Sequence, residues 1–346
     1  VAAPMPVLAP VMIRTGFSSG MAMRLRCGRV APVDPTAARF PAVPTRAGHY
    51  ESFYLKLCHP SEPLAAWIRY TVHKRPGAAP TGSLWFTLFE SGGPRAAKLT
   101  VPDPHTGGAD WLGVGEARIG GDGASGAIGE EVAWQLAVDE AEESLFHLPA
   151  AWLYRAPLPR TKLLSPAPAA RFSGRLSVDG RTIEVDGWRG MIGHNWGAQH
   201  AERWIWLHGI TPDGDWLDAA IGRVKVGSLT TPWVANGALS IAGDRYALRR
   251  ARVTEYPTSC TFDLSGRGVR VRGTVEAPRE RFVGWVYADP DGSEHHALNC
   301  SIADMRLRVS RGSGAAAELV VSAGAAYELG MRERDHGVPV QAYADG

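Results

Sequence analysis

The chain has 346 residues, which is more than one ordinary domain needs and enough for two domains with a core each. Hydrophobic residues make up 45% and charged residues 21%, which excludes a disordered chain. The net charge of +2 gives no reason to expect a nucleic acid or an anionic membrane surface as partner.

The first part of the chain, residues 1–45, is rich in Pro, Ala and Arg and shows no hydrophobic periodicity, so we expect a disordered tail. Its apolar residues 7–13 are interrupted by Pro10 and follow no basic residue, which does not fit a secretory signal. The run Gly16-Phe17-Ser18-Ser19-Gly20 matches the nucleophile-elbow pattern G-x-S-x-G. That elbow needs a strand before it and a helix after it, and neither is predicted here, so we interpret the match as chance.

From residue 46 to residue 156 the chain is typical of an antiparallel β domain. Short segments rich in aromatic and β-branched residues predict strands over residues 52–58, 66–74, 83–90, 132–138 and 151–155. Two proline clusters then follow, Pro157-Leu158-Pro159 and Ser165-Pro166-Ala167-Pro168. Because proline cannot donate a hydrogen bond to a neighbouring strand, we predict a semi-rigid linker over residues 157–169.

Residues 170–346 show the same pattern of short strand-like segments with clearer turn signals between them, and we predict a second β domain there. Two-residue hairpin signals separate the predicted strands at Asp179-Gly180, Asp213-Gly214, Gly243-Asp244 and Asp291-Gly292. Many short strands at hairpin spacing predict an all-β fold, as a meander barrel or a sandwich. Closure into barrels would remove the exposed strand edges.

The cysteine spacing and the length of the apolar runs argue against several further classes of protein. The four cysteines show no C-x-x-C spacing, which argues against a zinc ribbon, and their small number argues against a disulfide framework in so long a chain. No apolar run approaches the roughly 20 residues that cross a bilayer, so we expect no stable membrane insertion. We expect a cytoplasmic protein, and the sequence leaves its oligomeric state open.

The densest group of chemically informative residues lies between Gly190 and Gly209. If residues 203–209 form a strand, its alternation places Trp204, Trp206 and His208 on one face and Ile205 and Leu207 on the other. Both faces are apolar, so we expect this strand to be buried on both sides, between a cavity and a second layer. The chain holds 12 Trp, a residue that often lines cavities.

These residues resemble a known family. Asn195-Trp196-Gly197 followed by Trp204-Ile205-Trp206, after a hairpin at Val178-Asp179-Gly180, resembles the tocopherol cyclase family and, more broadly, the carotenoid 1,2-hydratase and lipocalin-like Diels–Alderase group. Glu51-Ser52-Phe53-Tyr54 resembles the opening strand of that family. The resemblance implies two lipocalin-like domains in tandem around a hydrophobic cavity. It also implies long apolar substrates of isoprenoid or polyketide type, handled without a metal or nucleotide cofactor.

The chemistry that the resemblance implies is hydration, cyclisation or isomerisation. Protonating an isolated alkene needs an acid in an apolar pocket, where burial keeps a carboxylic acid protonated. The candidate acids are Glu51, His194 and Glu202. Aromatic faces stabilise the resulting cation by roughly 0.5–2 kcal/mol per ring. The candidate substrate-binding residues are Tyr54, Asn195, Trp196, Trp204, Trp206 and His208.

One departure from the family pattern weakens the enzymatic interpretation. Carotenoid hydratases carry an Asp directly before the His of this motif, and this chain has Gly193 before His194. A second hypothesis is therefore a carrier or sensor that binds a lipophile without reaction, and a third is a barrel filled by its own side chains.

Histidines also raise the question of a metal site. His194, His200, Glu202 and His208 lie close in sequence, but zinc requires three or four convergent ligands and this alternation does not supply them. We therefore expect no metal site and no cofactor. Glu294-His295-His296 follows a predicted turn and is expected on the surface.

Overall fold

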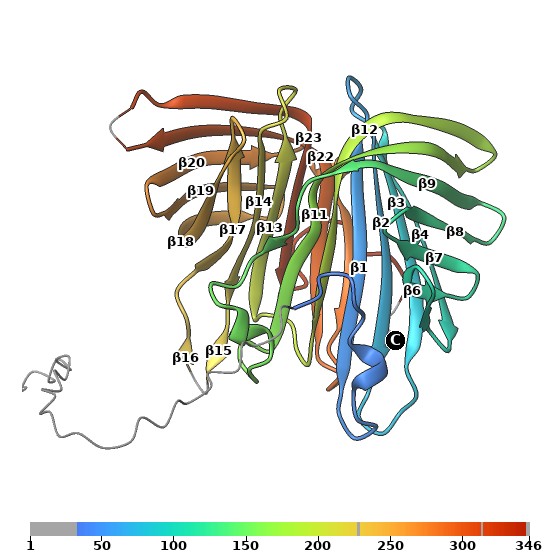
Figure 1. Ribbon diagram of the computed structural model, residues 1–346. Coiled ribbons are helices and arrows are strands. Elements are labelled where there is room, and N and C mark those ends of the chain that lie inside the picture. The colour runs from blue at the N-terminus through green and yellow to red at the C-terminus, as the bar shows by residue number, and fades with distance from the viewer. Residues whose placement is uncertain (1–32, 227–228, 313, 344–346) are drawn as a thin grey trace, which may run out of the picture. The chain divides into compact units, whose positions relative to one another are not determined.

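A computed structural model describes residues 33–226, 229–312 and 314–343, and this part of the chain is almost entirely antiparallel β-structure (Figure 1). The predicted all-β class is confirmed. No helix of the described residues is long and apolar enough to span a membrane. The nucleophile-elbow match at residues 16–20 lies outside the described residues, as does most of the predicted tail.

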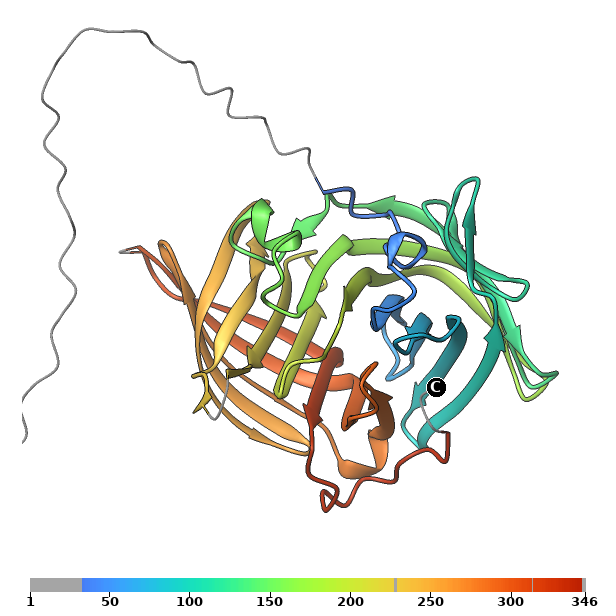
Figure 2. The same ribbon diagram turned by 90° about the horizontal axis from the view of Figure 1, so that it is seen from below.

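Twelve strands form the first sheet. Its strand order is β4-β3-β2-β1-β12-β11-β9-β8-β7-β6-β5, and β10 pairs with β11 beside this path. No pairing joins β4 to β5, so this sheet curves as an open half-barrel (Figure 2). The strands are β1 (His49–Cys58), β2 (Ala65–Lys74), β3 (Thr81–Glu90), β4 (Gly93–Pro102), β5 (His105–Gly107), β6 (Asp110–Val114), β7 (Ala117–Gly120), β8 (Gly123–Ile128), β9 (Val132–Ala141), β10 (Leu145–Phe146), β11 (Thr161–Val178) and β12 (Arg181–Gly197).

Nine strands form the second sheet, and eight of them close into a barrel. The order is β20-β19-β18-β17-β14-β13-β23-β22-β21, and an additional pairing of β20 with β22 closes the ring. The strands are β13 (Arg203–Ile210), β14 (Trp216–Arg223), β17 (Val234–Ile241), β18 (Asp244–Tyr256), β19 (Ser259–Gly266), β20 (Val269–Glu276), β21 (Val283–Ala288), β22 (Glu294–Arg311) and β23 (Ala317–Met331). The remaining elements are the short ribbon of β15 (Lys225–Val226) and β16 (Leu229–Thr230) and the 3₁₀ turns η1 (Phe40–Ala42), η2 (Ala151–Tyr154) and η3 (Arg279–Arg281).

The hairpin signals in the sequence mark real turns. Asp179 and Gly180 both have positive φ, 50° and 79°, and they join the two longest neighbouring strands, β11 and β12. This is the backbone of a primed two-residue turn, which matches the right-handed twist of the flanking strands. The turn predicted at Gly243-Asp244 is shifted by one residue, because Ala242 and Gly243 take the positive φ values there.

The predicted linker over residues 157–169 differs from the structure. From Thr161 onward these residues belong to β11, which pairs with β9 and β12. The register shifts between Leu164 and Ala167 and again between Ala167 and Ala170, so the strand bulges where Pro166 and Pro168 lie. Bulges remove the need for a backbone N–H at those positions, and they let a strand carry prolines that regular pairing would exclude.

The chain changes sheets later than predicted, between β12 and β13. Tyr50 pairs with Gly197 and Cys58 with Arg189, so β12 lies beside β1 in the first sheet. Residues 170–197 therefore belong with the first sheet, although the sequence predicted a second domain from residue 170. The predicted tail also ends earlier, because the backbone N–H groups of Arg39 and Phe40 donate to the buried Glu51 carboxylate.

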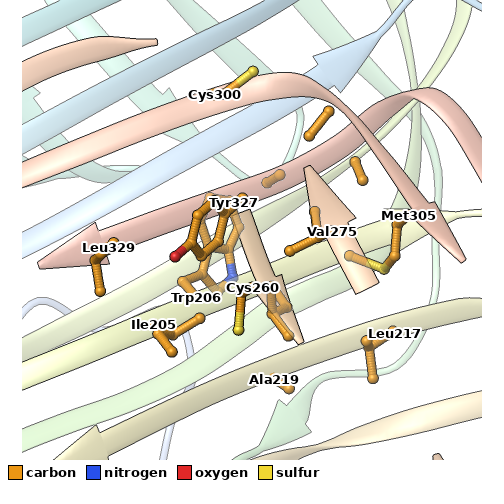
Figure 3. Close-up of a cluster of buried hydrophobic side chains, with 14 of the residues drawn as sticks. Ile205, Trp206, Leu217, Ala219, Cys260, Val275, Cys300, Met305, Tyr327 and Leu329 are labelled. Atoms are coloured by element: carbon orange, nitrogen blue, oxygen red, sulfur yellow. The ribbon is translucent and has the colours of Figure 1, made fainter. Parts of the chain in front are cut away.

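Alternation along β1 and β2 sends side chains to two different interiors. Phe53, Leu55 and Ile68 belong to a core within the first sheet. Cys58 and Trp67, from the opposite faces of the same strands, belong to a second core that fills the barrel and reaches across to the first sheet. Figure 3 shows part of this second core, including Ile205, Leu217, Cys260, Val275, Met305 and Leu329. The two sheets are therefore joined by shared apolar packing, and the cavity described next lies between them.

Candidate functional site

A cavity of about 360 Å³ lies where the first sheet meets the barrel. Its wall takes residues from β1, β2, β11 and β12 on one side and from β13, β14, β17, β21 and β23 on the other. Most of the wall is apolar or aromatic. The apolar and aromatic lining residues are Tyr54, Trp67, Leu148, Leu153, Leu163, Leu164, Trp204, Trp206, Ile221, Val224, Val234 and Tyr287.

Four of the residues predicted to bind substrate line this cavity: Tyr54, Asn195, Trp204 and Trp206. The alternation expected along β13 holds, because Trp204 and Trp206 share the cavity face while Ile205 and Leu207 are fully buried. Tyr54 reaches the cavity from β1 and meets the Trp206 ring edge-on, with ring centroids 5.4 Å apart. Burial raises the pKa of Tyr54 well above its usual value, so its hydroxyl keeps its proton.

The three predicted acids lie outside the wall of the cavity. The Glu51 carboxylate accepts bonds from His194 Nε2 at 2.8 Å and from the backbone N–H groups of Arg39 and Phe40, and it lies 3.3 Å from His49 Nε2. Burial raises its pKa, but these hydrogen bonds outweigh burial and lower it to about 2. Glu51 is therefore an ionised anchor for the segment before β1, and it cannot donate a proton into this cavity.

The other predicted residues outside the wall have structural contacts of their own. Glu202 is half-buried and pairs with Arg332 at 3.0 Å. Trp196 packs in a small separate cluster, under the guanidinium of Arg39. His208 is fully buried, lies 3.5 Å from Lys56 Nζ and donates from Nε2 to the Pro168 carbonyl. Burial lowers the pKa of His208 to about 4.

The structure brings Arg69, His147 and Glu328 into the wall, which the sequence did not single out, and with them His200, which the sequence raised only as a possible metal ligand. Glu328 accepts hydrogen bonds from Trp204 Nε1 at 2.8 Å and from Asn299 Nδ2 at 3.0 Å. The Arg69 guanidinium lies 4.2 Å above the Tyr287 ring, and within the part of the chain that the structure describes its buried Nη1 has no hydrogen-bond partner. A single glutamate within the apolar run of β23 is the signal that sequence reading passed over.

Behind the cavity wall, a buried carboxylate fixes the indole of Trp206. Asp218 is fully buried and accepts from Ser165 Oγ at 2.5 Å and from Trp206 Nε1 at 3.3 Å, while His147 Nε2 lies 3.3 Å away. Burial raises the pKa of Asp218, but the charge and hydrogen bond of His147 outweigh burial and lower it. Ser165 Oγ donates to the carboxylate and also lies 3.2 Å from His147 Nε2, so this group ties β11 to β14 behind the wall.

In the cavity wall, His200 belongs to a second polar cluster with Asp289 and His295. Asp289 Oδ1 accepts two hydrogen bonds from His200, one from the backbone N–H and one from Nδ1, each at 2.7 Å. His295 Nδ1 lies 3.8 Å from Asp289 Oδ2. Burial raises the pKa of Asp289, but the hydrogen bond and charge of His200 outweigh burial and lower it. Burial lowers the pKa of His295 to about 4, so this imidazole is neutral at pH 7.

The surface position predicted for Glu294-His295-His296 is wrong for His295, which is fully buried. The strand β22 already begins at Glu294, directly after the turn, and its alternation sends His295 inward toward Trp204. A turn signal therefore did not imply that the next residues are exposed.

A half-barrel and a closed eight-stranded barrel around an aromatic cavity define a protein of the tandem lipocalin-like class. Two solved structures share the fold. A Nitrosomonas europaea protein described as an AttH candidate has a TM-score of 0.56 and 15% identity, over 88% of this chain and 99% of its own. Kievitone hydratase from Nectria haematococca has a TM-score of 0.53 and 11% identity, over 88% of this chain and 94% of its own.

Similarity in sequence extends to two proteins of Mycobacterium tuberculosis, from strains CDC 1551 / Oshkosh and H37Rv. Each is 28% identical to this chain over 293 residues, which covers 82% of this chain and 88% of the relative. Both relatives carry the description uncharacterised. No family model matches the sequence.

Proposed function

We propose that this protein binds a hydrophobic small molecule of isoprenoid or polyketide type in the cavity between its sheets, and that it catalyses hydration, cyclisation or isomerisation there. The observation that carries the proposal is the cavity itself, about 360 Å³ with aromatic walls and a few ionisable groups. Binding sites for small molecules combine these features, at volumes of roughly 300–1,000 Å³.

One nitrogen of the Arg69 guanidinium supports an oxygen acceptor on the ligand. Its Nη1 is buried and has no hydrogen-bond partner among the described residues, although an unmet buried donor costs roughly 1–3 kcal/mol and more when charged. Tyr54 presents a protonated hydroxyl in the same cavity. Both groups are donors. The ligand that suits this wall is therefore an apolar body with one oxygen acceptor, such as a carbonyl, phenolate or carboxylate.

The reaction class rests on the fold likeness and on the ionisable groups of the wall. Kievitone hydratase, which shares the fold, is by its name a hydratase, and this supports addition or removal of water as the chemistry. The wall residues that can support proton transfer here are Tyr54 and Glu328, in place of Glu51, His194 and Glu202, and Arg69 can stabilise a developing negative charge. If the cavity binds a lipophile without turnover, the protein is a carrier.

Ligand binding tests the proposal. We expect at least one compound of an isoprenoid and polyketide panel to bind, as measured by native mass spectrometry and tryptophan fluorescence. Trp206→Ala should lower the affinity for that compound by about tenfold or more, because an aromatic contact is lost. Arg69→Met keeps the apolar stem and should weaken ligands with an oxygen acceptor more than pure hydrocarbons. The control is Trp152→Ala, because Trp152 is 61% exposed and does not line the cavity. A folded protein that binds no member of the panel would contradict the proposal.

A further inference from the structure

The cluster of His200, Asp289 and His295 carries an inference that is independent of the cavity's ligand. One candidate ligand atom from each of these residues can be chosen so that all three lie within 4.8 Å of one another. They come from three separate places: the segment between β12 and β13, the residue after β21, and the second residue of β22. The fold therefore brings together donors that are far apart in sequence.

The imidazoles of this cluster have buried nitrogens without partners. Both ring nitrogens of His295 are buried and unbonded among the described residues, and so is Nε2 of His200. The side chain of His295 is fully buried. Buried polar atoms are bonded in the large majority of cases, and an exception indicates a water or an ion at that place. An ion that binds one nitrogen of each imidazole beside the Asp289 carboxylate would satisfy two of these three atoms.

The hydrogen bonds within the cluster are those of a metal site. A histidine that binds a metal through one ring nitrogen usually donates from the other to a carboxylate, which fixes its tautomer and orientation. His200 Nδ1 contacts Asp289 Oδ1 in this manner, which leaves Nε2 free. Asp289 Oδ2, which accepts from Ser293 Oγ at 3.2 Å and lies 3.8 Å from His295 Nδ1, and one ring nitrogen of His295 remain as further candidate ligand atoms.

We propose that His200, Asp289 and His295 bind a divalent transition-metal ion of the zinc class. Two imidazole nitrogens and one carboxylate oxygen are common ligands of Zn²⁺, and three protein ligands leave a fourth position open. His200 also lines the cavity, so an ion held by this cluster would lie beside the cavity wall. There its open position can hold a water molecule or polarise an oxygen of the ligand. The expectation of no metal site was drawn from His194, His200, Glu202 and His208; of these only His200 takes part, and Asp289 and His295 lie far from it in the sequence.

Direct metal binding tests the site without any knowledge of the ligand. We expect the full chain, stripped with EDTA, to bind one Zn²⁺ per molecule by isothermal titration and elemental analysis. His295→Gln and Asp289→Asn should weaken this affinity by about 10- to 100-fold or more. Co²⁺ in place of Zn²⁺ should give the visible absorption of a four- or five-coordinate ion, which both variants should lose.

The controls separate this site from surface binding. His296 Nδ1 lies 2.8 Å from His336 Nε2, so His336→Gln removes the competing histidine pair and should leave the bound Zn²⁺ unchanged. The proposal would be overturned if the folded wild type bound neither Zn²⁺ nor Co²⁺. It would also be overturned if His336→Gln abolished metal binding while His295→Gln kept it. If His295→Gln does not fold, Asp289→Asn and the Co²⁺ spectrum of the wild type decide. Lipophile binding measured in EDTA keeps the two proposals separate.

Discussion

Single buried polar residues fall into two groups that point to different roles. Glu51, Asp218 and Glu328 each accept several hydrogen bonds, so their burial is compensated. Arg69, His200 and His295 keep buried nitrogens without hydrogen-bond partners among the described residues. Protein donors satisfy the carboxylates of the first group, and Glu328 of that group also lines the cavity. The second group lies at or beside the cavity, where a bound molecule or ion would supply what is missing.

At this scale we expect Glu51→Gln to lower the free energy of unfolding by roughly 2–4 kcal/mol at pH 7, because one partner of a buried charged network is lost. The folded-state pKa of Glu51, about 2, lies below its ordinary 4.5. Its contribution is therefore complete above pH 4.5 and is lost as the pH falls from there toward 2. Thermal unfolding between pH 7 and pH 3 measures both effects.

The variant should also show a weaker dependence of melting temperature on pH in the acid range than the wild type. Glu140→Gln is the matched control, since Glu140 forms an exposed pair with Arg171 and should change neither quantity. Equal acid sensitivity in Glu51→Gln and wild type would refute the assignment of Glu51 as a buried anchor.

Among the elements, strand alternation could be predicted from the sequence and strand neighbours could not. Period two along residues 203–209 correctly placed Trp204 and Trp206 on one face, because that rule needs only the local chain. Arg69 and Glu328 were missed because their place in the cavity depends on which strands meet across the two sheets. The two sheets meet by packing of side chains more than a hundred positions apart, such as Trp67 and Trp285, and no local pattern encodes that contact.

The dependence on distant strand partners also explains why β11 is a strand and not the predicted linker. Prolines were correctly expected to interrupt regular pairing, but the interruption took the form of bulges within a strand, since both sides of β11 are held by partners. The carbonyls of the two prolines are used: Pro166 accepts from Ser144 Oγ and Pro168 from His208 Nε2. Tertiary pairing thus overrode a local signal.

For the pairing of β1 with β12, we expect Gly190→Ala to be destabilising by roughly 1–3 kcal/mol. A Cβ atom on Gly190 would lie 1.9 Å from the carbonyl oxygen of Lys56, so the two strands would have to separate. Gly222→Ala in β14 is the control, because its nearest neighbour would be 3.7 Å away, an ordinary contact. Urea unfolding of both variants measures the difference, and equal midpoints would contradict the close approach of these strands.

At the scale of the whole molecule, the two sheets share one core rather than touching at a surface. Trp285 of β21 lies 5.0 Å from Trp85 and 6.4 Å from Trp67, measured between ring centroids, so aromatic rings from both sheets pack together. All three are almost fully buried. Separating the sheets would expose these rings to water, which opposes independent opening.

We therefore expect the folded chain to unfold in a single transition, and Trp285→Ala to lower the stability of both sheets together by about 3–5 kcal/mol. Differential scanning calorimetry tests the first expectation by comparing calorimetric and van't Hoff enthalpies. Hydrogen exchange of amides in β3 and β22 tests the second. Two resolved transitions, or protection lost in only one sheet, would refute it, and Trp152→Ala should change neither.

The order of strands along the chain has a further consequence. Every strand of the first sheet precedes residue 198, every strand of the second follows residue 202, and the described strands are connected across the two sheets by that short segment alone. A coding sequence cut there would yield two polypeptides that each hold a complete set of hydrogen-bonded neighbours. A cut within either sheet would instead separate strands that pair. The segment between β12 and β13 is therefore the position at which the chain can be split into complementary fragments, and this segment contains His200, which lines the cavity.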